Sequence, residues 1–286
     1  MGKKVWFLIL VLVAFSFSMM GCSSLYDEAW YQAPNWTPEG LIYFQKSITH
    51  YRQEPMGTIT LGTDYEYWTM TVDGTQETKL PYTSYPYYSP KGTYVAMISG
   101  SNLNIVRRSD NQTVYSYAFP IAYGGSLDWG PDDDKLVYQK ASSGTLITMN
   151  IDGSNPIEIT SKEVMPDIAW KYNSMIACIG DYLTLVSSDG VTSEVLLSDV
   201  PLTFYPNYYS DGKYLFTADT NKFYKIDLNS KDVVSAVSHQ LNSFKPQKVW
   251  INPKLSPDNQ KVIGGFSLDT GIWITNIDGT GLKQLK

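Results

Sequence analysis

Short apolar segments alternate with polar turn residues over most of the chain. Residues 68–72, 146–151 and 272–277 are rich in β-branched and aromatic side chains, and each segment runs into an Asp-Gly pair. Asp-Gly supplies the positive φ angles that a two-residue hairpin loop requires, so these segments predict antiparallel strands joined by tight hairpins.

A second pattern recurs six times: an aromatic or apolar residue, a turn resembling Ser-Pro-Asp-Gly, and an apolar strand. The Pro or its equivalent falls at positions 38, 90, 131, 172, 210 and 257, giving spacings of 52, 41, 41, 38 and 47 residues. Periods near 40 residues with several strands each are typical of propeller blades. We therefore predict an all-β, six-bladed propeller of four-stranded antiparallel blades, starting near residues 34, 86, 127, 168, 206 and 253. A seven-bladed ring with one missed blade, or a β-sandwich, is the alternative.

The repeat is clearest in Trp129-Gly130-Pro131-Asp132 and in Leu255-Ser256-Pro257-Asp258. It resembles the WD40-like (PD40) repeat of the TolB-type β-propellers, over about residues 34–286. The resemblance implies an interaction role in the periplasm. The aromatic residue before each turn is expected to pack between blades.

The N-terminal residues predict a targeting signal. Lys3 and Lys4 precede an apolar run over residues 5–17, which is short for a membrane-spanning helix and typical of a secretory signal peptide over residues 1–21. Gly21-Cys22 resembles the lipobox of bacterial lipoproteins, which implies diacylglycerol on Cys22, a tether over residues 22–33 and a lipid-anchored protein of the cell envelope. Ser23 after the Cys implies retention at the outer membrane, on its periplasmic or surface face. An ordinary signal peptide with an incidental Cys is the alternative.

The charge balance excludes nucleic acid as a partner. Removing residues 1–21 leaves 20 basic and 28 acidic side chains, a formal charge of −8. Phosphate binding needs clustered Lys and Arg, and an acidic body needs acyl chains to stay on a membrane. Cys178 lies in the apolar run over residues 175–179 and is expected in the core.

Candidate chemistry is sparse, so we expect no enzyme, no cofactor and no metal. His50 and His239 are the only histidines, and both are expected at the surface. Gly125-Ser126-Leu127-Asp128 lacks the final Gly of a nucleophile elbow. The run Asp132-Asp133-Asp134 lacks the spaced pattern of a calcium loop, which leaves a solvated turn as its interpretation.

Two features of the first blade leave alternatives open. An insertion over about residues 47–66 is polar and rich in Thr and Tyr, so it forms either a binding loop or a solvated hairpin extension. Residues 25–32 either pair with the last blade to close the ring, or the ring closes by packing alone.

Two aromatic clusters are the candidate binding residues: Tyr82, Tyr85, Tyr87 and Tyr88, and Phe204, Tyr205, Tyr208 and Tyr209. Near a channel mouth such rings bind a peptide or stack on sugars; the alternative is that they pack between blades. We expect a monomeric, membrane-anchored propeller that binds an envelope protein or peptide. A glycan-binding or polysaccharide-acting propeller is the alternative.

Overall fold

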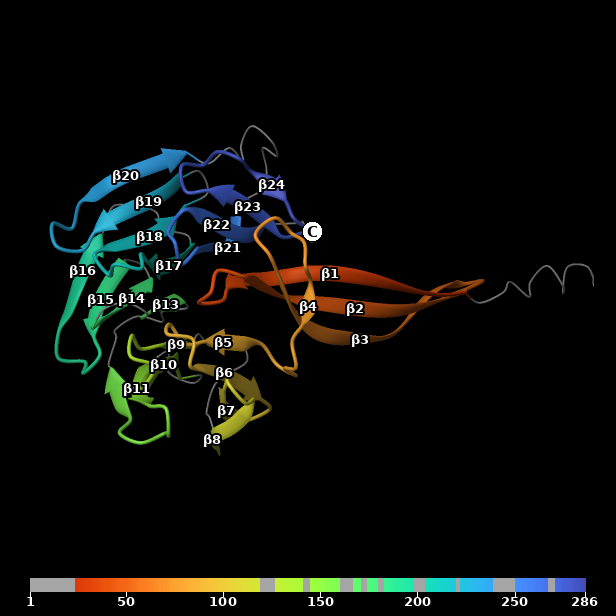
Figure 1. Ribbon diagram of the computed structural model, residues 1–286, viewed down its shortest axis with the longest axis horizontal. Helices are drawn as coiled ribbons and strands as arrows, with labels where there is room; N and C mark the ends of the chain where they lie inside the picture. The colour runs from red at the N-terminus through yellow and green to blue at the C-terminus, as the bar shows by residue number, and fades with distance from the viewer. Residues whose placement is uncertain are drawn as a thin grey trace, which may run out of the picture.

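A computed structural model describes residues 24–118, 127–140, 145–159, 167–170, 174–179, 183–197, 204–219, 222–238, 250–266 and 271–286. These residues form six four-stranded antiparallel sheets arranged as the blades of a propeller, which confirms the predicted fold (Figure 1). None of them belongs to a helix long and apolar enough to cross a bilayer.

Each blade is a meander of four consecutive strands. The first two blades contain β1 (Ser24–Trp36), β2 (Ile42–Glu54), β3 (Gly57–Met70), β4 (Thr78–Lys79), β5 (Pro86–Tyr88), β6 (Tyr94–Ser99), β7 (Asn102–Arg107) and β8 (Gln112–Ala118). The next two contain β9 (Leu127–Trp129), β10 (Lys135–Gln139), β11 (Leu146–Asn150), β12 (Ile157–Ile159), β13 (Asp167–Ala169), β14 (Met175–Ile179), β15 (Leu183–Ser187) and β16 (Ser193–Leu197). The last two contain β17 (Phe204–Tyr208), β18 (Tyr214–Ala218), β19 (Lys222–Asp227), β20 (Val233–Ser238), β21 (Trp250–Leu255), β22 (Lys261–Phe266), β23 (Trp273–Asn276) and β24 (Lys283–Gln284).

The ring closes by packing, without a strand shared between the first and last blades. β1 pairs only with β2, and its root lies against β21 and β22. Trp36 Nε1 donates a hydrogen bond of 3.0 Å to the carbonyl of Lys254 in β21, and Lys286 forms an ion pair with Glu77. Of the two closure alternatives, packing alone is therefore confirmed.

The repeat aromatics form the contacts between blades, as predicted. They are all buried: Trp36, Tyr88, Trp129, Trp170 and Tyr209. Trp129 Nε1 reaches across to the carbonyl of Tyr87, 2.8 Å away in the preceding blade, so its indole combines apolar burial with a satisfied donor. Cys178 is fully buried without a disulfide, and burial raises the pKa of its thiol to about 12.

The Asp-Gly hairpins differ from the predicted two-residue loops. Gly74 has a φ of +88°, but Asp73 is not in the left-handed region, so only the glycine of the Asp-Gly pair has a positive φ. This is the longer hairpin connection, a type I turn followed by a left-handed glycine. The Asp73 carboxylate accepts hydrogen bonds from Thr71 Oγ1 and from the backbone and hydroxyl of Thr75, and these bonds lower its pKa to about 2.

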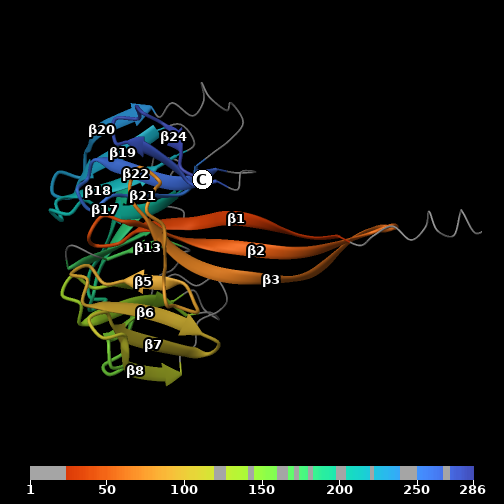
Figure 2. The same ribbon diagram turned by 45° about the vertical axis from the view of Figure 1, so that its right-hand side comes forward.

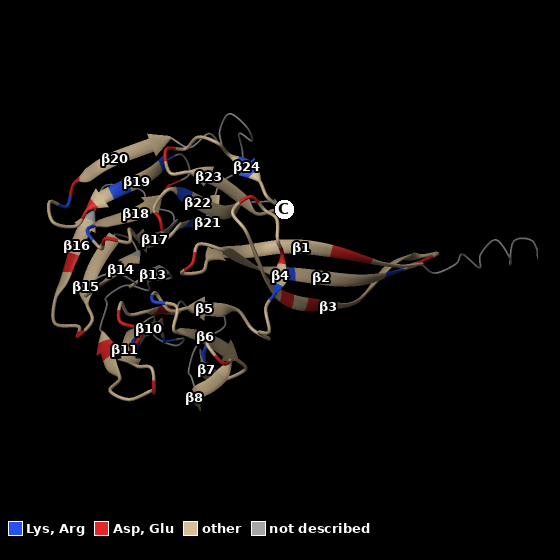
Figure 3. Ribbon diagram, in the orientation of Figure 1, with Lys and Arg blue, Asp and Glu red and all other residues tan. Residues whose placement is uncertain are grey.

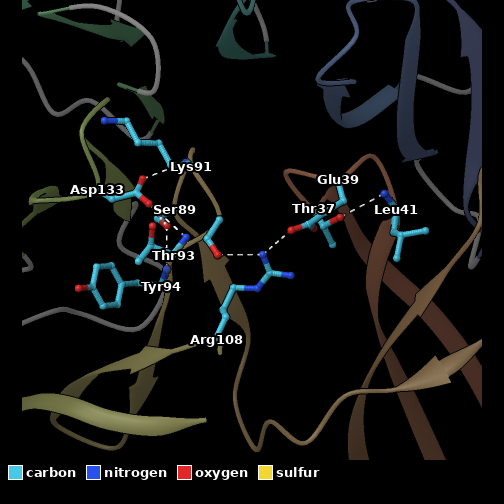
Figure 4. Close-up of polar contacts among 10 residues, drawn as sticks. Thr37, Glu39, Leu41, Ser89, Lys91, Thr93, Tyr94, Arg108 and Asp133 are labelled. Atoms are coloured by element: carbon cyan, nitrogen blue, oxygen red, sulfur yellow. Dashed lines mark hydrogen bonds and ion pairs between the residues drawn. The ribbon is translucent and has the colours of Figure 1, made fainter. Parts of the chain in front are cut away.

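The acidic run in blade three is not a solvated turn throughout. Asp133 is only 4% exposed and binds the turn of the preceding blade (Figure 4). Its carboxylate accepts hydrogen bonds from Ser89 Oγ at 2.8 Å, from Lys91 N at 3.0 Å and from Thr93 N at 3.2 Å. The prediction fails here because charge alone does not show that a neighbouring blade presents three donors.

Blade one extends far beyond the ring (Figures 1 and 2). β2 has 13 residues where β6 of the next blade has 6, and seven further residues at about 3.3 Å each add about 23 Å. The insertion over residues 47–66 is therefore a hairpin extension, turning at Pro55 and Met56 before Gly57, whose φ of +144° suits only glycine. β1 begins at Ser24 and pairs with this hairpin, so the residues expected to form a tether from there onward are ordered as a strand.

Candidate interaction surface

The projecting sheet consists of residues 24–32 of β1, 45–54 of β2 and 57–67 of β3. Side chains alternate between the two faces of a strand, so the register assigns each residue to a face. Tyr26 lies opposite Tyr51, and Trp30 lies opposite Ser47, which in turn lies opposite Tyr65. These residues share one face, which we call the aromatic face.

The aromatic face presents large side chains to solvent. Trp30 is 46% exposed and Tyr65 is 58% exposed, and both flank the small Ser47 of the central strand. Nearer the β2–β3 turn at the free end of the sheet, Tyr26 and Tyr51 stack with ring centroids 5.1 Å apart. Exposed Trp and Tyr concentrated on one surface are typical of an interaction site, because they bury much area with few rotatable bonds.

Hydrogen bonds between the strands hold the polar residues of this face in place. Gln32 Nε2 donates to Ser47 Oγ at 2.6 Å, and the hydroxyls of Thr49 and Thr63 lie 3.1 Å apart. Cross-strand pairs of this kind stabilise a sheet whose outer part has no hydrophobic core beneath it. The exposed rings are therefore carried on a sheet with a defined register.

The opposite, charged face carries a histidine between two carboxylates. His50 Nδ1 lies 2.7 Å from Asp27 Oδ1, and His50 Nε2 lies 3.2 Å from Asp64 Oδ2. Hydrogen bonds to Asp27 and Asp64 raise the pKa of the imidazole. His50 is at the surface, as predicted, and it links all three strands of the projecting sheet.

Further along the charged face, a second group of side chains supports the root of the sheet. Lys46 Nζ lies 5.4 Å above the ring of Trp68, and Trp68 Nε1 donates to Glu66 at 2.9 Å. Lys79 of β4 binds the same carboxylate, and these hydrogen bonds lower the pKa of Glu66. The charged side chains here are paired with each other.

Along residues 24–32 of β1 and 57–66 of β3, the edges of the projecting sheet lack a backbone hydrogen-bonded neighbour on their outer side within the described part of the chain. β1 pairs only with β2, and β4 pairs with β3 at Trp68 and Thr69. Next to β4, Leu80 N donates to the carbonyl of Tyr67 at 2.8 Å, which covers only the innermost residue of the β3 edge. The acidic residues lie mainly on the two edge strands (Figure 3). The sheet carries five acidic and two basic side chains: Asp27, Glu28, Glu54, Asp64 and Glu66, against Lys46 and Arg52.

The first predicted tyrosine cluster lies at the root of the aromatic face. Tyr67 continues this face inward, and its ring lies 6.2 Å from that of Tyr85, which is 5.2 Å from that of Tyr87. Tyr85 donates its hydroxyl to the carbonyl of Ala33 at 3.0 Å, and burial raises its pKa well above the usual range. Tyr88 is buried, whereas Tyr82, Tyr85 and Tyr87 are half-buried. Binding through this cluster stays a prediction.

The second predicted cluster lies in blade five and is not brought together with the first. Tyr208 and Tyr209 are both buried. Tyr208 donates its hydroxyl to the carbonyl of Met175 in blade four at 2.7 Å, so its polar end is used between blades. Phe204 and Tyr205 lie in β17, but their side chains are outside the described residues, and so are Cys22, Ser126 and His239.

No group of three or more His, Cys, Asp or Glu side chains that could hold a metal ion occurs among the described residues.

Trp30 and Tyr65 were not predicted as site residues. Their signal is the shared face, which becomes visible only once residues 24–32 are paired with the insertion.

No protein-family model matches the chain, and no curated protein shows a significant match to it. The resemblance to the TolB-type repeat therefore rests on the repeat residues and on the six-bladed ring.

Proposed function

We propose that this protein is a lipid-anchored propeller of the bacterial cell envelope that binds an extended segment of another protein along its projecting sheet. One observation supports this most strongly: exposed aromatic residues lie on the two edge strands, whose outer edges have no backbone hydrogen-bonded neighbour along residues 24–32 and 57–66 of the described chain. An added strand uses such an edge for backbone hydrogen bonds and the exposed rings for side-chain contacts.

The charge of the projecting sheet indicates the chemistry of the partner. Asp27 and Glu28 lie on one edge strand, and Asp64 and Glu66 lie on the other. Acidic edges disfavour pairing between copies of the same chain. They favour a segment with Lys or Arg beside its apolar residues, because complementary charges speed association and suppress wrong partners.

The anchor and the absence of catalysis are part of the proposal. The Gly21-Cys22 pair after an apolar run supports acylation at Cys22, at the outer membrane of a host that has one. The ring would act as a rigid scaffold rather than as an enzyme. Sugar stacking on Trp30 and Tyr65 is the second candidate, and the unpaired strand edges favour a protein segment over it.

Crosslinked pull-downs from membranes test the proposed function. We expect Trp30→Ala together with Tyr65→Ala to reduce the yield of a specific crosslinked partner several-fold. Truncating anchor residues at an interface costs about 2 kcal/mol or more. Tyr115→Ala is the matched control, since Tyr115 is an exposed tyrosine on β8 of another blade.

A parallel sample with Cys22→Ala separates anchoring from binding. We expect this variant to lose the acyl mass, and to lose or reduce the partner because the two proteins no longer share a membrane. An equal partner yield from the double alanine variant and wild type would contradict binding at the aromatic face. Enrichment of glycan rather than protein would favour the second candidate.

A further inference from the structure

The free end of the projecting sheet presents large aliphatic side chains to solvent. Met56, in the turn between β2 and β3, is fully exposed, and Leu25 is 73% exposed. Leu25 lies opposite Arg52, which lies opposite the exposed Ile59. We define the tip as residues 24–26 of β1 together with residues 51–60.

Charge is balanced within the tip and becomes acidic immediately behind it. Arg52 Nε lies 2.9 Å from Glu54 Oε1, so the two charged side chains of the tip form one ion pair. The outermost pairs otherwise contain uncharged residues, such as Ser24 and Gln53. Asp27 and Glu28 follow directly, which sets a boundary between a surface that tolerates lipid and one that stays in water.

Tyr26 follows Leu25 in β1 and lies one position further from the free end of the sheet. Tyr26 and Tyr51 stack across β1 and β2, between the Leu25 position and the acidic residues. Tyr is enriched at membrane–water interfaces, because its ring is apolar and its hydroxyl is hydrated. Arg52, which lies opposite Leu25, can extend its charged end toward the headgroups.

The position of Cys22 in the chain identifies the occupant of this surface. Two peptide units join Cys22 to Ser24, so their Cα atoms are at most about 7.6 Å apart. An acyl group on Cys22 therefore places the tip at the bilayer surface.

From these observations we propose that the tip inserts into the headgroup region of the membrane and that the projecting sheet acts as a rigid spacer. The inference rests on the proposed lipid anchor and goes beyond it, because an acyl chain alone does not require protein to enter the bilayer. The ring is then held about 20 Å from the membrane surface, which is close to the length by which the sheet extends beyond the blades.

The face of the ring that is turned to the membrane also follows. The projection extends the end of blade one that carries the β2–β3 turn. In a meander the β1–β2 and β3–β4 turns lie at the other end, so the Ser-Pro turns of the blades and their Asp-Gly hairpins point away from the membrane. The aromatic face spans the gap between membrane and ring, where it is open to a partner in the same compartment.

Spin labels on the mature, acylated protein test this proposal. Met56→Cys carries the label at the tip, Thr60→Cys and Thr63→Cys carry it progressively further back on β3, and Ser109→Cys, exposed on blade two, is the aqueous control. The native Cys178 is buried. The protein is reconstituted in vesicles of phosphatidylethanolamine with a minor fraction of phosphatidylglycerol, and collisions with oxygen and with a water-soluble nickel chelate are measured.

We expect the ratio of oxygen to nickel collisions to be several-fold higher at position 56 than at 109, and to fall from 56 through 60 to 63. A label at 56 that is as accessible to nickel as the label at 109, on protein that floats with vesicles and carries the acyl mass, would overturn tip insertion and leave the anchor intact. Loss of access to both reagents at 56 would show a protein occupant, such as a second copy, and would also overturn it. Protein without acyl mass that fails to float would overturn both proposals.

Discussion

At the residue scale, one turn position explains how neighbouring blades are joined. Gly40, Gly92 and Gly212 hold it in three blades with positive φ, and Asp133 and Asn259 hold it in two others with φ of +61°. Where a side chain is present, it binds the preceding blade: Asn259 Oδ1 accepts from Ser210 N at 3.1 Å, as Asp133 accepts from its three donors. The sequence shows Asp133 and Asn259 where other blades have glycine. It does not show what their side chains bind, because the hydrogen-bond partners lie 40 to 49 residues away in the sequence.

A glycine at this position leaves room for a different contact. Arg108 Nη1 lies 3.0 Å from the carbonyl of Gly92 and 2.5 Å from Glu39 Oε1 in blade one. A Cβ at Gly92 would lie 2.9 Å from that guanidinium nitrogen, so the absence of a side chain is what lets Arg108 reach across (Figure 4). The hydrogen bond from Arg108 helps to lower the pKa of Glu39.

Asp133→Gly tests the buried contact without backbone strain, because glycine adopts positive φ freely. We expect the free energy of unfolding in urea to fall by about 1–3 kcal/mol, since donors in and near the Ser89 turn lose a buried partner. Asp132→Ala is the control, because Asp132 is exposed and pairs only with Lys91 at the surface. Equal stability of Asp133→Gly and wild type would contradict the role given to this carboxylate.

His50 gives the projecting sheet a pH dependence. Because its pKa is raised in the folded state, the stabilisation it provides is fully present below the unfolded pKa of about 6.5 and is lost as the pH rises through the folded pKa. An NMR titration of His50, assigned with His50→Gln, should give a pKa above 6.5, the ordinary value. Asp27→Asn with Asp64→Asn should bring it back toward that value. A wild-type pKa at or below it would contradict the bridging geometry.

At the scale of elements, the strands that pack in the ring were predictable, whereas the projecting hairpin was one of two alternatives and its pairing with β1 was not predicted. Strands such as β10 and β22 are largely apolar because both faces are covered, so a short apolar run bounded by turn residues identifies them. In the outer part of the projecting sheet neither face is buried, so residues 57–65 of β3 are a mixture of Thr, Tyr and other residues without an apolar run. Cross-strand register, rather than burial, defines its two faces, and no single segment contains that information.

The residues of the candidate site also include some that the sequence predicts and some that it does not. The tyrosines of the first predicted cluster were found from their density in the sequence, and they lie at the root of the aromatic face. Trp30 and Tyr65 are 35 residues apart in the sequence and meet only through β2. Their shared face could not be predicted without knowing that residues 24–32 pair with the insertion.

At the scale of the whole molecule, the repeat was sufficient to predict the number of blades. Six in-register turns near a period of 40 residues imply six equivalent units, and a ring is how such units bury their faces against each other. How the ring closes could not be predicted, because closure depends on contacts between the two ends of the fold, such as Trp36 with Lys254. The resulting molecule is a rigid ring with one long sheet standing out from it (Figure 2).

We propose above all that a protein partner lies along the aromatic face, between the ring and the membrane. A photoreactive phenylalanine analogue at position 65, compared with one at position 115, tests it most directly in living cells. We expect one dominant protein adduct from position 65, lost when Trp30→Ala is added, and no such adduct from position 115. The same adducts from both positions, or none from position 65, would contradict it.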